Sequence, residues 1–96
     1  MAELAIEKLE RASEVLKAIS HPVRISIIEL LTAQTQMTVT EIYSKLKIEQ
    51  AVASQHLKIL KSKNVCSVEK QGNTCLYSLK YPSISNILTC IEGCTP

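Results

Sequence analysis

The sequence predicts a small, mainly α-helical domain that carries one β-hairpin, in the order of four helices, two strands and a last helix. Three observations lead to this prediction. Apolar residues recur at helical spacing in the first third of the chain and near its C-terminus. Residues 48–62 resolve, at about 100° per residue, into an apolar and a polar face. Two runs of β-forming residues flank Gly72, which can adopt the positive φ of a hairpin turn.

The composition suits one domain with an aliphatic core. The 96 residues are 46% hydrophobic, which is enough for one core but not for two, so we expect a single domain over residues 1–96. The core must be aliphatic because Phe and Trp are absent. No apolar run approaches the ~20 residues of a membrane span, and the N-terminal segment is acidic where a signal peptide would be basic. We therefore expect a cytoplasmic protein with no membrane partner and with reduced cysteines.

Helix-capping residues delimit the first two predicted helices. Residues 2–19 carry apolar side chains at helical spacing, at Leu9, Ala12, Leu16 and Ile19. Ser20 is a favourable N-cap for the second helix, and Pro22 is tolerated in its first turn. The second helix should end near residues 32–34, after the core run Ile25, Ile27, Ile28, Leu30 and Leu31.

Similar signals place the third and the last helices. Thr38 and Glu41 have the spacing of a capping box, which predicts a short third helix to about Lys47 and then a tight turn. Apolar residues at helical spacing near the C-terminus predict a last helix that begins at residues 82–83. Gly93 is expected to end this helix, since glycine is common just after helix C-termini.

The hairpin is predicted from residues 65–70 and 74–79, which are β-type runs around Gly72. With a two-residue loop, the period-two rule puts one set of side chains on the same face: Cys66, Val68, Cys75, Tyr77 and Leu79. The tip then carries a cation and two amides that could reach a DNA backbone or minor groove: Lys70, Gln71 and Asn73.

The fourth predicted helix, residues 50–62, has the most informative side-chain pattern. Its apolar side comprises Val52, Ala53, His56, Ile59 and Leu60, with Leu57 at the margin. Its other side comprises Gln50, Ala51, Ser54, Gln55, Lys58 and Lys61. This polar side has no carboxylate. Amides can bond to base edges and ammonium groups to phosphates, so the pattern suits a helix in the major groove of DNA. The alternative is a solvated helix that lacks acidic residues by chance.

Two short helices joined by a tight turn, the second with a basic polar side, describe a helix-turn-helix, and the hairpin adds a wing. The charge distribution agrees with this interpretation. Residues 1–41 carry four basic and six acidic side chains, whereas residues 42–80 carry seven lysines and two glutamates. A positive field on one part of the chain is expected when that part meets a polyanion. The alternative is a chance cluster of solubilising lysines.

Other function classes fit the sequence less well. The chain has no Asp and only two glycines, so neither a Ser-His-Asp arrangement nor a phosphate-cradling loop can be assembled. We therefore predict no catalytic residues and no cofactor. Proteins that bind single-stranded nucleic acid stack bases on aromatic side chains, of which the three Tyr are few. A module that binds another protein through its terminal helices remains the alternative to a protein that binds duplex DNA.

Four stretches together resemble the ArsR/SmtB family of winged helix-turn-helix repressors: Leu16–Arg24, Val39–Ile42, Ala53–Leu60 and Leu76–Leu79. The resemblance covers nearly the whole chain. It implies a homodimer whose first and last helices form the interface and whose recognition helices enter successive major grooves of an inverted-repeat operator. The apolar stripes of the terminal helices independently favour a dimer, because a domain of this size can hardly bury them alone.

The resemblance also implies roles for particular residues. Gln50, Ser54 and Gln55 match the base-contacting positions of the family, and Lys58 matches a phosphate contact. The chain departs from the family pattern at Glu49, where Ser often caps the recognition helix, and at Ala51, where a second Ser is common. The carboxylate of Glu49 favours the helix dipole but opposes the approach of a phosphate.

Two histidines are interpreted as structural, and one arginine keeps two interpretations. His56 lies among apolar neighbours on the inward side of the fourth helix, which predicts a core histidine with a satisfied hydrogen bond rather than a metal ligand or a base. His21 is part of a Ser-His-Pro-x-Arg turn that resembles the family. Arg24 is left with two alternatives, support of that turn or contact with the DNA backbone.

The sequence does not identify an effector that the protein senses. In the family, metal ions or metalloids bind thiolates on the third helix or carboxylates and histidines on the last one. Here the third helix has no Cys and residues 82–96 have no His, so no metal site of these types is predicted. Cys90 and Cys94 have i,i+4 spacing, although the predicted stop at Gly93 would leave Cys94 on a tail. Three alternatives stay open for this pair: inert thiols, a switch operated by a small oxidant or reactive sulfur, and a soft-metal or metalloid site.

Cys66 and Cys75 share a face of the hairpin but are offset along it. A disulfide needs Cα atoms within about 7 Å, so a direct bridge between them is not expected. We interpret both as small apolar core residues.

Overall fold

The computed structural model describes residues 5–94, apart from the side chains of Ile91 and Cys94. Within this range the elements are, in order, α1 (Ile6–Ile19), α2 (Pro22–Gln34), β1 (Met37–Thr38), α3 (Val39–Leu46), α4 (Gln50–Ser62), β2 (Cys66–Gln71), β3 (Thr74–Leu79), η1 (Pro82–Ile84) and α5 (Ser85–Cys94). This is the winged helix-turn-helix that the sequence predicts. No helix among these elements is long and apolar enough to cross a membrane.

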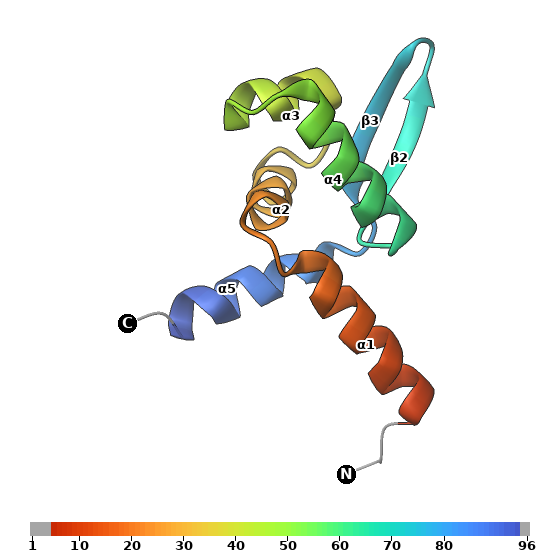
Figure 1. The fold of residues 1–96 in the computed structure, drawn as a ribbon, viewed down its shortest axis with the longest axis vertical. Helices are drawn as coiled ribbons and strands as arrows, with labels where there is room; N and C mark the ends of the chain where they lie inside the picture. The colour runs from red at the N-terminus through yellow and green to blue at the C-terminus, as the bar shows by residue number, and fades with distance from the viewer. Residues whose placement is uncertain (1–4, 95–96) are drawn as a thin grey trace.

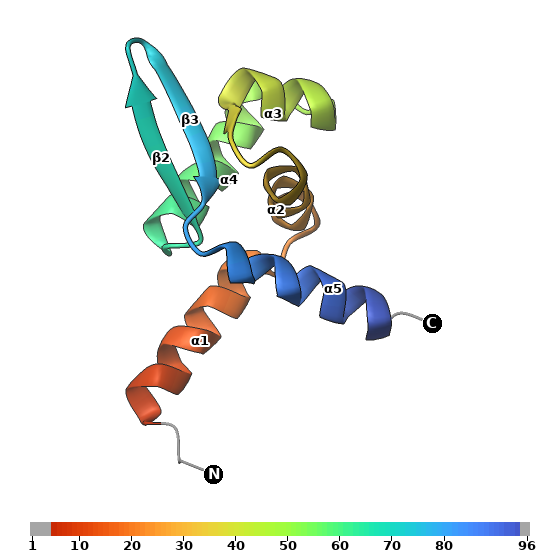
Figure 2. The same cartoon turned by 180° about the vertical axis from the view of Figure 1, so that it is seen from behind.

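The central helices and the hairpin form the body of the molecule, and the two terminal helices project from it (Figure 1). The β2–β3 wing rises beside α4, and its turn lies at the opposite end of the molecule from the start of α1. Seen from behind, α5 crosses the base of the body next to α2, while α1 extends away from it (Figure 2). This arrangement separates the predicted DNA-contacting elements from the predicted dimerisation helices.

The core is aliphatic, as the composition predicts. Its fully buried side chains come from α2, α3, α4 and the start of the wing: Ile27, Ile28, Leu31, Ile42, Leu57, Leu60, Val65 and Cys66. The prediction was wrong on one of them. Leu57 was placed at the margin of the apolar side of α4, but its side chain is 0% exposed. Because α4 packs against α2, α3 and β2 at once, Leu57 lies at the centre of its buried side.

The small sheet has the strand order β1-β3-β2, and both pairs are antiparallel. β3 has the predicted bounds, and the register confirms the predicted shared face, since Cys66 pairs with Leu79 and Val68 with Tyr77. Gln71 pairs with Thr74, so the turn is the two residues Gly72 and Asn73, and Gly72 has φ +64°. β1 was not predicted, because a two-residue strand is too short to show an alternating pattern.

The structure confirms some predicted helix ends and corrects others. The capping box is present: the Glu41 backbone N–H donates to the Thr38 hydroxyl (3.1 Å), and the Thr38 N–H donates to the Glu41 carboxylate (2.9 Å). The N-cap of α2 is His21 rather than Ser20, because His21 Nδ1 accepts the Val23 backbone N–H at 3.1 Å. Gly93 does not end α5, which continues to Cys94.

The start of the first helix is only partly comparable with the prediction of residues 2–19. α1 begins at Ile6, after the N-cap Ala5, and residues 2–4 lie outside the described range. The last helix is preceded by the short 3-10 turn η1, which begins at the predicted Pro82.

Candidate nucleic-acid interface

The exposed side of α4 is the centre of the candidate interface. All six predicted contact residues of this helix are exposed: Gln50, Ala51, Ser54, Gln55, Lys58 and Lys61. The opposite side is anchored by Ala53, Leu57 and Leu60, each 0% exposed. Burial of this apolar stripe fixes the rotation of the helix about its axis, so the amide, hydroxyl and ammonium groups point to solvent together.

The turn between α3 and α4 sets the angle at which α4 is presented. Lys47 caps α3 in the left-handed region with φ +56°, a conformation that favours glycine. The Ile48 N–H donates to the Tyr43 carbonyl at 3.1 Å and so closes the turn. Glu49 then begins α4 without a side-chain capping hydrogen bond. The departure from the family pattern at Glu49 therefore leaves a carboxylate, and no hydroxyl cap, at the start of the recognition helix.

The wing places its three predicted contact residues differently. Lys70, Gln71 and Asn73 are all exposed at or next to the hairpin turn. Lys70 pairs with Cys75 and Gln71 with Thr74, so Lys70 and Gln71 alternate to opposite faces of the hairpin. A single duplex surface lying against one face of the wing would thus meet one of these two side chains and not the other.

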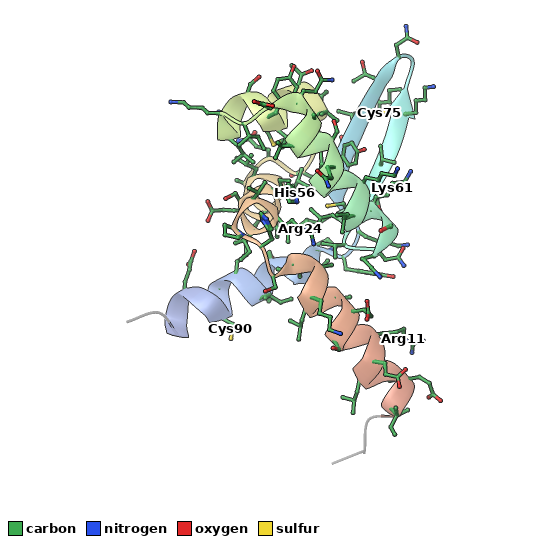
Figure 3. The ribbon with its side chains drawn as sticks, viewed as in Figure 1. Arg11, Arg24, His56, Lys61, Cys75 and Cys90 are labelled. Carbon is green, nitrogen blue, oxygen red and sulfur yellow. The ribbon has the colours of Figure 1, made fainter. Side chains whose placement is uncertain are left out.

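Arg24 and His56 lie side by side between α2 and α4 (Figure 3), and the ring of His21 lies against that of His56. Arg24 Nε donates to His56 Nδ1 at 3.1 Å, and Arg24 Nη1 donates to the Ala18 carbonyl at 3.0 Å. The rings of His21 and His56 lie 4.4 Å apart. The predicted hydrogen bond of His56 is present, but its side chain is half-buried at the edge of the core rather than within it. Of the two alternatives for Arg24, the structure shows support of the turn.

The described cysteines lie in three different environments. Cys66 is buried, and burial raises the pKa of its thiol to about 12. Cys75 is half-buried on the wing, and Cys90 is exposed on α5 (Figure 3). Cys66 pairs with Leu79 and Cys75 with Lys70, so the two thiols are offset as expected, and both are free. The side chain of Cys94 lies outside the described residues.

Over the described part of the chain, no cluster of three or more His, Cys, Asp or Glu side chains could hold a metal ion.

Two lysines of the basic segment make contacts that the sequence analysis did not predict. Lys63 Nζ, at the end of α4, lies 3.2 Å from the Glu14 carboxylate of α1, which holds the pKa of Glu14 below its ordinary value. Lys80 Nζ donates to Asn64 Oδ1 at 3.1 Å. Two of the seven lysines of the basic segment are thus engaged by the protein itself. Helical or strand periodicity could not have shown either contact, because the partners are 49 and 16 residues apart in sequence.

The chain is similar in sequence to known DNA-binding regulators. A family model described as a helix-turn-helix domain matches residues 19–64. The chain is 39% identical over 82 residues to the HTH-type transcriptional repressor SmtB of Mycobacterium tuberculosis, covering 85% of this chain and 60% of that protein. It is 35% identical over 80 residues to the transcriptional repressor PagR of Bacillus anthracis, covering 83% of this chain and 80% of PagR.

Solved structures of similar proteins have the same fold. The crystal structure of PagR superposes with a TM-score of 0.84 at 32% identity, over 91% of this chain and 99% of that one. The homodimeric winged helix-turn-helix DNA-binding domain Mb0332 of Mycobacterium bovis has a TM-score of 0.80 at 22% identity, over 96% of this chain and 87% of that one, a likeness of fold alone. The chain spans 60% of the mycobacterial SmtB repressor. Each of these proteins is named for DNA binding or transcriptional regulation, and none of them for an enzyme.

Proposed function

Because the chain belongs to the ArsR/SmtB family of winged helix-turn-helix transcriptional regulators, we propose that it is a repressor that binds duplex DNA as a homodimer at an inverted-repeat operator. The observation that carries the proposal is the exposed side of α4, which has amide, hydroxyl and ammonium groups and no carboxylate. Such a side can hydrogen-bond to base edges while its lysines neutralise phosphates.

In the proposed complex the roles divide along α4. Gln50, Ser54 and Gln55 contact base edges, and Lys58 and Lys61 contact phosphates. Ala51 offers only a methyl group, which suits an apolar contact such as a thymine methyl. The wing adds backbone or minor-groove contacts through whichever of Lys70, Gln71 and Asn73 face the duplex.

The dimer is supported by apolar surface left on the terminal elements. Ile6, Leu9 and Leu16 of α1 are 70%, 48% and 55% exposed, although they are large aliphatic side chains. They recur at helical spacing on a side of α1 that the other described residues leave uncovered. A second copy that covers this stripe would bury it and hold two α4 helices at the ~34–36 Å spacing of successive major grooves, or at a multiple of it.

The test begins with selection of duplexes from a random pool by the purified full chain. The selected sequences are expected to contain an inverted repeat, because a two-fold dimer presents two equivalent helices. Affinity for the selected duplex should fall steeply with salt, with a log–log slope of about −0.9 per phosphate contact. Binding that ignores salt, or a pool without enrichment, would instead favour the protein-interaction module.

Substitutions on α4 then separate the two kinds of contact. Gln55→Ala should reduce the preference for the selected duplex over a scrambled one, at a cost of about 1–3 kcal/mol to the selected duplex. Lys58→Ala should weaken binding to both duplexes similarly and reduce the salt slope by about one. Lys8→Ala, which removes a lysine from the opposite part of the chain, is the matched control. Equal loss on both duplexes for Gln55→Ala would refute its base-contacting role.

We also propose that any thiol-based effector acts at Cys90 and Cys94. Cys90 is exposed, and α5 continues to Cys94, so the backbone positions of both residues belong to one helix at i,i+4 spacing. Mass spectrometry and gel shifts after treatment with a thiol oxidant or polysulfide, and in parallel after titration with arsenite, distinguish a reactive-sulfur switch from a metalloid site. Wild type and Cys90→Ser should differ under one of these treatments. Unchanged DNA affinity under all of them would identify the thiols as inert.

A further inference from the structure

The cluster of Arg24, His21 and His56 joins three helices at one point. Arg24 belongs to α2, its Nη1 donates to the Ala18 carbonyl in the last turn of α1, and its Nε donates to His56 of α4. His21 is the N-cap of α2 and lies against His56. One guanidinium therefore connects the helix with the exposed apolar stripe to the helix with the exposed polar side.

The direction of these hydrogen bonds requires that both histidines are neutral. An arginine N–H can only donate, so His56 Nδ1 must supply a lone pair and carry its proton on Nε2. His21 Nδ1 likewise accepts the Val23 backbone N–H. A protonated imidazole has no acceptor, so a proton on either Nδ1 removes that hydrogen bond.

Electrostatics in the cluster act in the same direction. Burial lowers the pKa of His56, and the electrostatic effects of the neighbouring His21 and Arg24 lower it further. Among the groups that act on His56 in the described part of the chain, from α2 and its cap, there is no carboxylate to offset them. The neutral form is thus favoured in the folded protein. Its contribution to stability is complete above the ordinary pKa of 6.5 and is lost as the pH falls through the lowered pKa.

We propose that Arg24 is a positioning residue for DNA binding, which holds α4 against the end of α1 through neutral His56, so that protonation of His56 releases the recognition helix. The proposal rests on the proposed function. It predicts that specific DNA affinity falls in mild acid. The added positive charge of protonated histidines would by itself raise affinity for a polyanion, so the sign of the effect distinguishes positioning from simple charge.

Affinity for the selected duplex, measured between pH 8.0 and 5.5 at constant ionic strength, tests this. Wild type should lose affinity as the pH falls, by about tenfold where His56 is protonated, as expected for one charge-assisted hydrogen bond. His56→Asn keeps an acceptor oxygen near the position of Nδ1 but cannot titrate, so it should bind like wild type at pH 8.0 and lose less than about twofold in acid. His21→Asn, which retains a capping oxygen, should keep the full wild-type loss.

Variants of Arg24 complete the test. Arg24→Met should show about tenfold weaker binding at pH 8.0 and a flat pH profile. Arg24→Lys keeps the charge but cannot bridge Ala18 and His56, so it should resemble Arg24→Met and also covers the case in which Arg24→Met fails to fold. Circular dichroism of each sample verifies that it is folded. A wild-type pH profile in His56→Asn, a flat profile in His21→Asn, or wild-type affinity in Arg24→Lys would overturn the proposal.

A measurement without DNA keeps the two proposals apart. Nitrogen-15 NMR of the free protein at pH 7.5 should show His56 Nδ1 as an unprotonated acceptor and Nε2 as protonated, and Arg24→Met should shift the Nδ1 resonance. A proton on Nδ1 would overturn the arrangement at Arg24. If wild type bound no duplex at neutral pH, the proposed function would fail, while these resonances would still decide whether Arg24 holds His56.

Discussion

Cys66 and Cys90 show how burial gives one residue type two chemistries. Cys66 is 2% exposed within the core, and burial raises the pKa of its thiol to about 12. Cys90 lies exposed on α5. Since the thiolate is the reactive form, Cys66 should be inert at neutral pH, which agrees with its interpretation as a small core residue.

This difference can be measured directly. Under native conditions at pH 7.5, a maleimide reagent should modify Cys90 rapidly and leave Cys66 unmodified until the protein unfolds. Peptide mass spectrometry over time reports both rates, and the same reaction in denaturant provides the control. Comparable native rates at the two residues would show that the start of the wing opens readily.

At the scale of the element, the helix-turn-helix depends on local hydrogen bonds at the start of α3. The Thr38–Glu41 capping box satisfies backbone groups at the N-terminus of α3. Thr38 also belongs to β1, which pairs with β3 of the wing. The carboxylate of Glu41 accepts hydrogen bonds from Thr38, which lower the pKa of Glu41. One residue thus links the helix that precedes α4 to the hairpin beside it.

Removal of the cap should destabilise the fold. Thr38→Ala is expected to lower the free energy of unfolding by about 1 kcal/mol, measured by urea denaturation at pH 7. Thr40→Ala, on the exposed side of the same turn, is the matched control and should change it little. Because the Glu41 pKa is lowered, its part of the cap persists above the ordinary value of 4.5 and is lost as the pH falls through the lowered pKa. Thr38→Ala keeps the Thr38 backbone N–H that the Glu41 carboxylate accepts, so this acid-labile part is lost in wild type and variant alike. A Thr38→Ala protein as stable as wild type at pH 7 would contradict the capping account.

At the scale of the whole molecule, α1 and α5 project away from the body that carries α4 and the wing (Figures 1 and 2). Contacts hold each terminal helix at one end, α1 against α2 and α4 and α5 against α2. The exposed stripe of α1 lies outside these contacts. The shape is what a dimer with two separated DNA-contacting ends requires.

Weakening the stripe should therefore dissociate the protein. Leu16→Gln is expected to shift the equilibrium toward monomer in analytical ultracentrifugation and to reduce operator affinity together with it. Lys17→Gln changes the adjacent, exposed residue of the same helix and should leave the dimer intact. A Leu16→Gln protein that sedimented like wild type would exclude this part of α1 from the interface.

The local spacing of residues in the sequence was enough to predict much of the secondary structure of this protein. The exposed polar side of α4, the Thr38–Glu41 capping box and the Gly72 turn were predicted correctly, because each depends on the spacing of residues within a few positions of one another. The positions of the DNA-contacting candidates on exposed surface follow from the same periodicity. Their roles in binding remain predictions.

Tertiary structure decided the rest. Leu57 became the centre of the α4 core side, β1 joined the sheet through β3, and α5 continued through Gly93. His21 acts as a helix cap, and Arg24 bonds to a residue 32 positions away. Such outcomes depend on which elements pack together and leave no signal in local spacing. The sequence shows which residues can hydrogen-bond and which helix sides are apolar, but tertiary packing determines which of these groups contact one another.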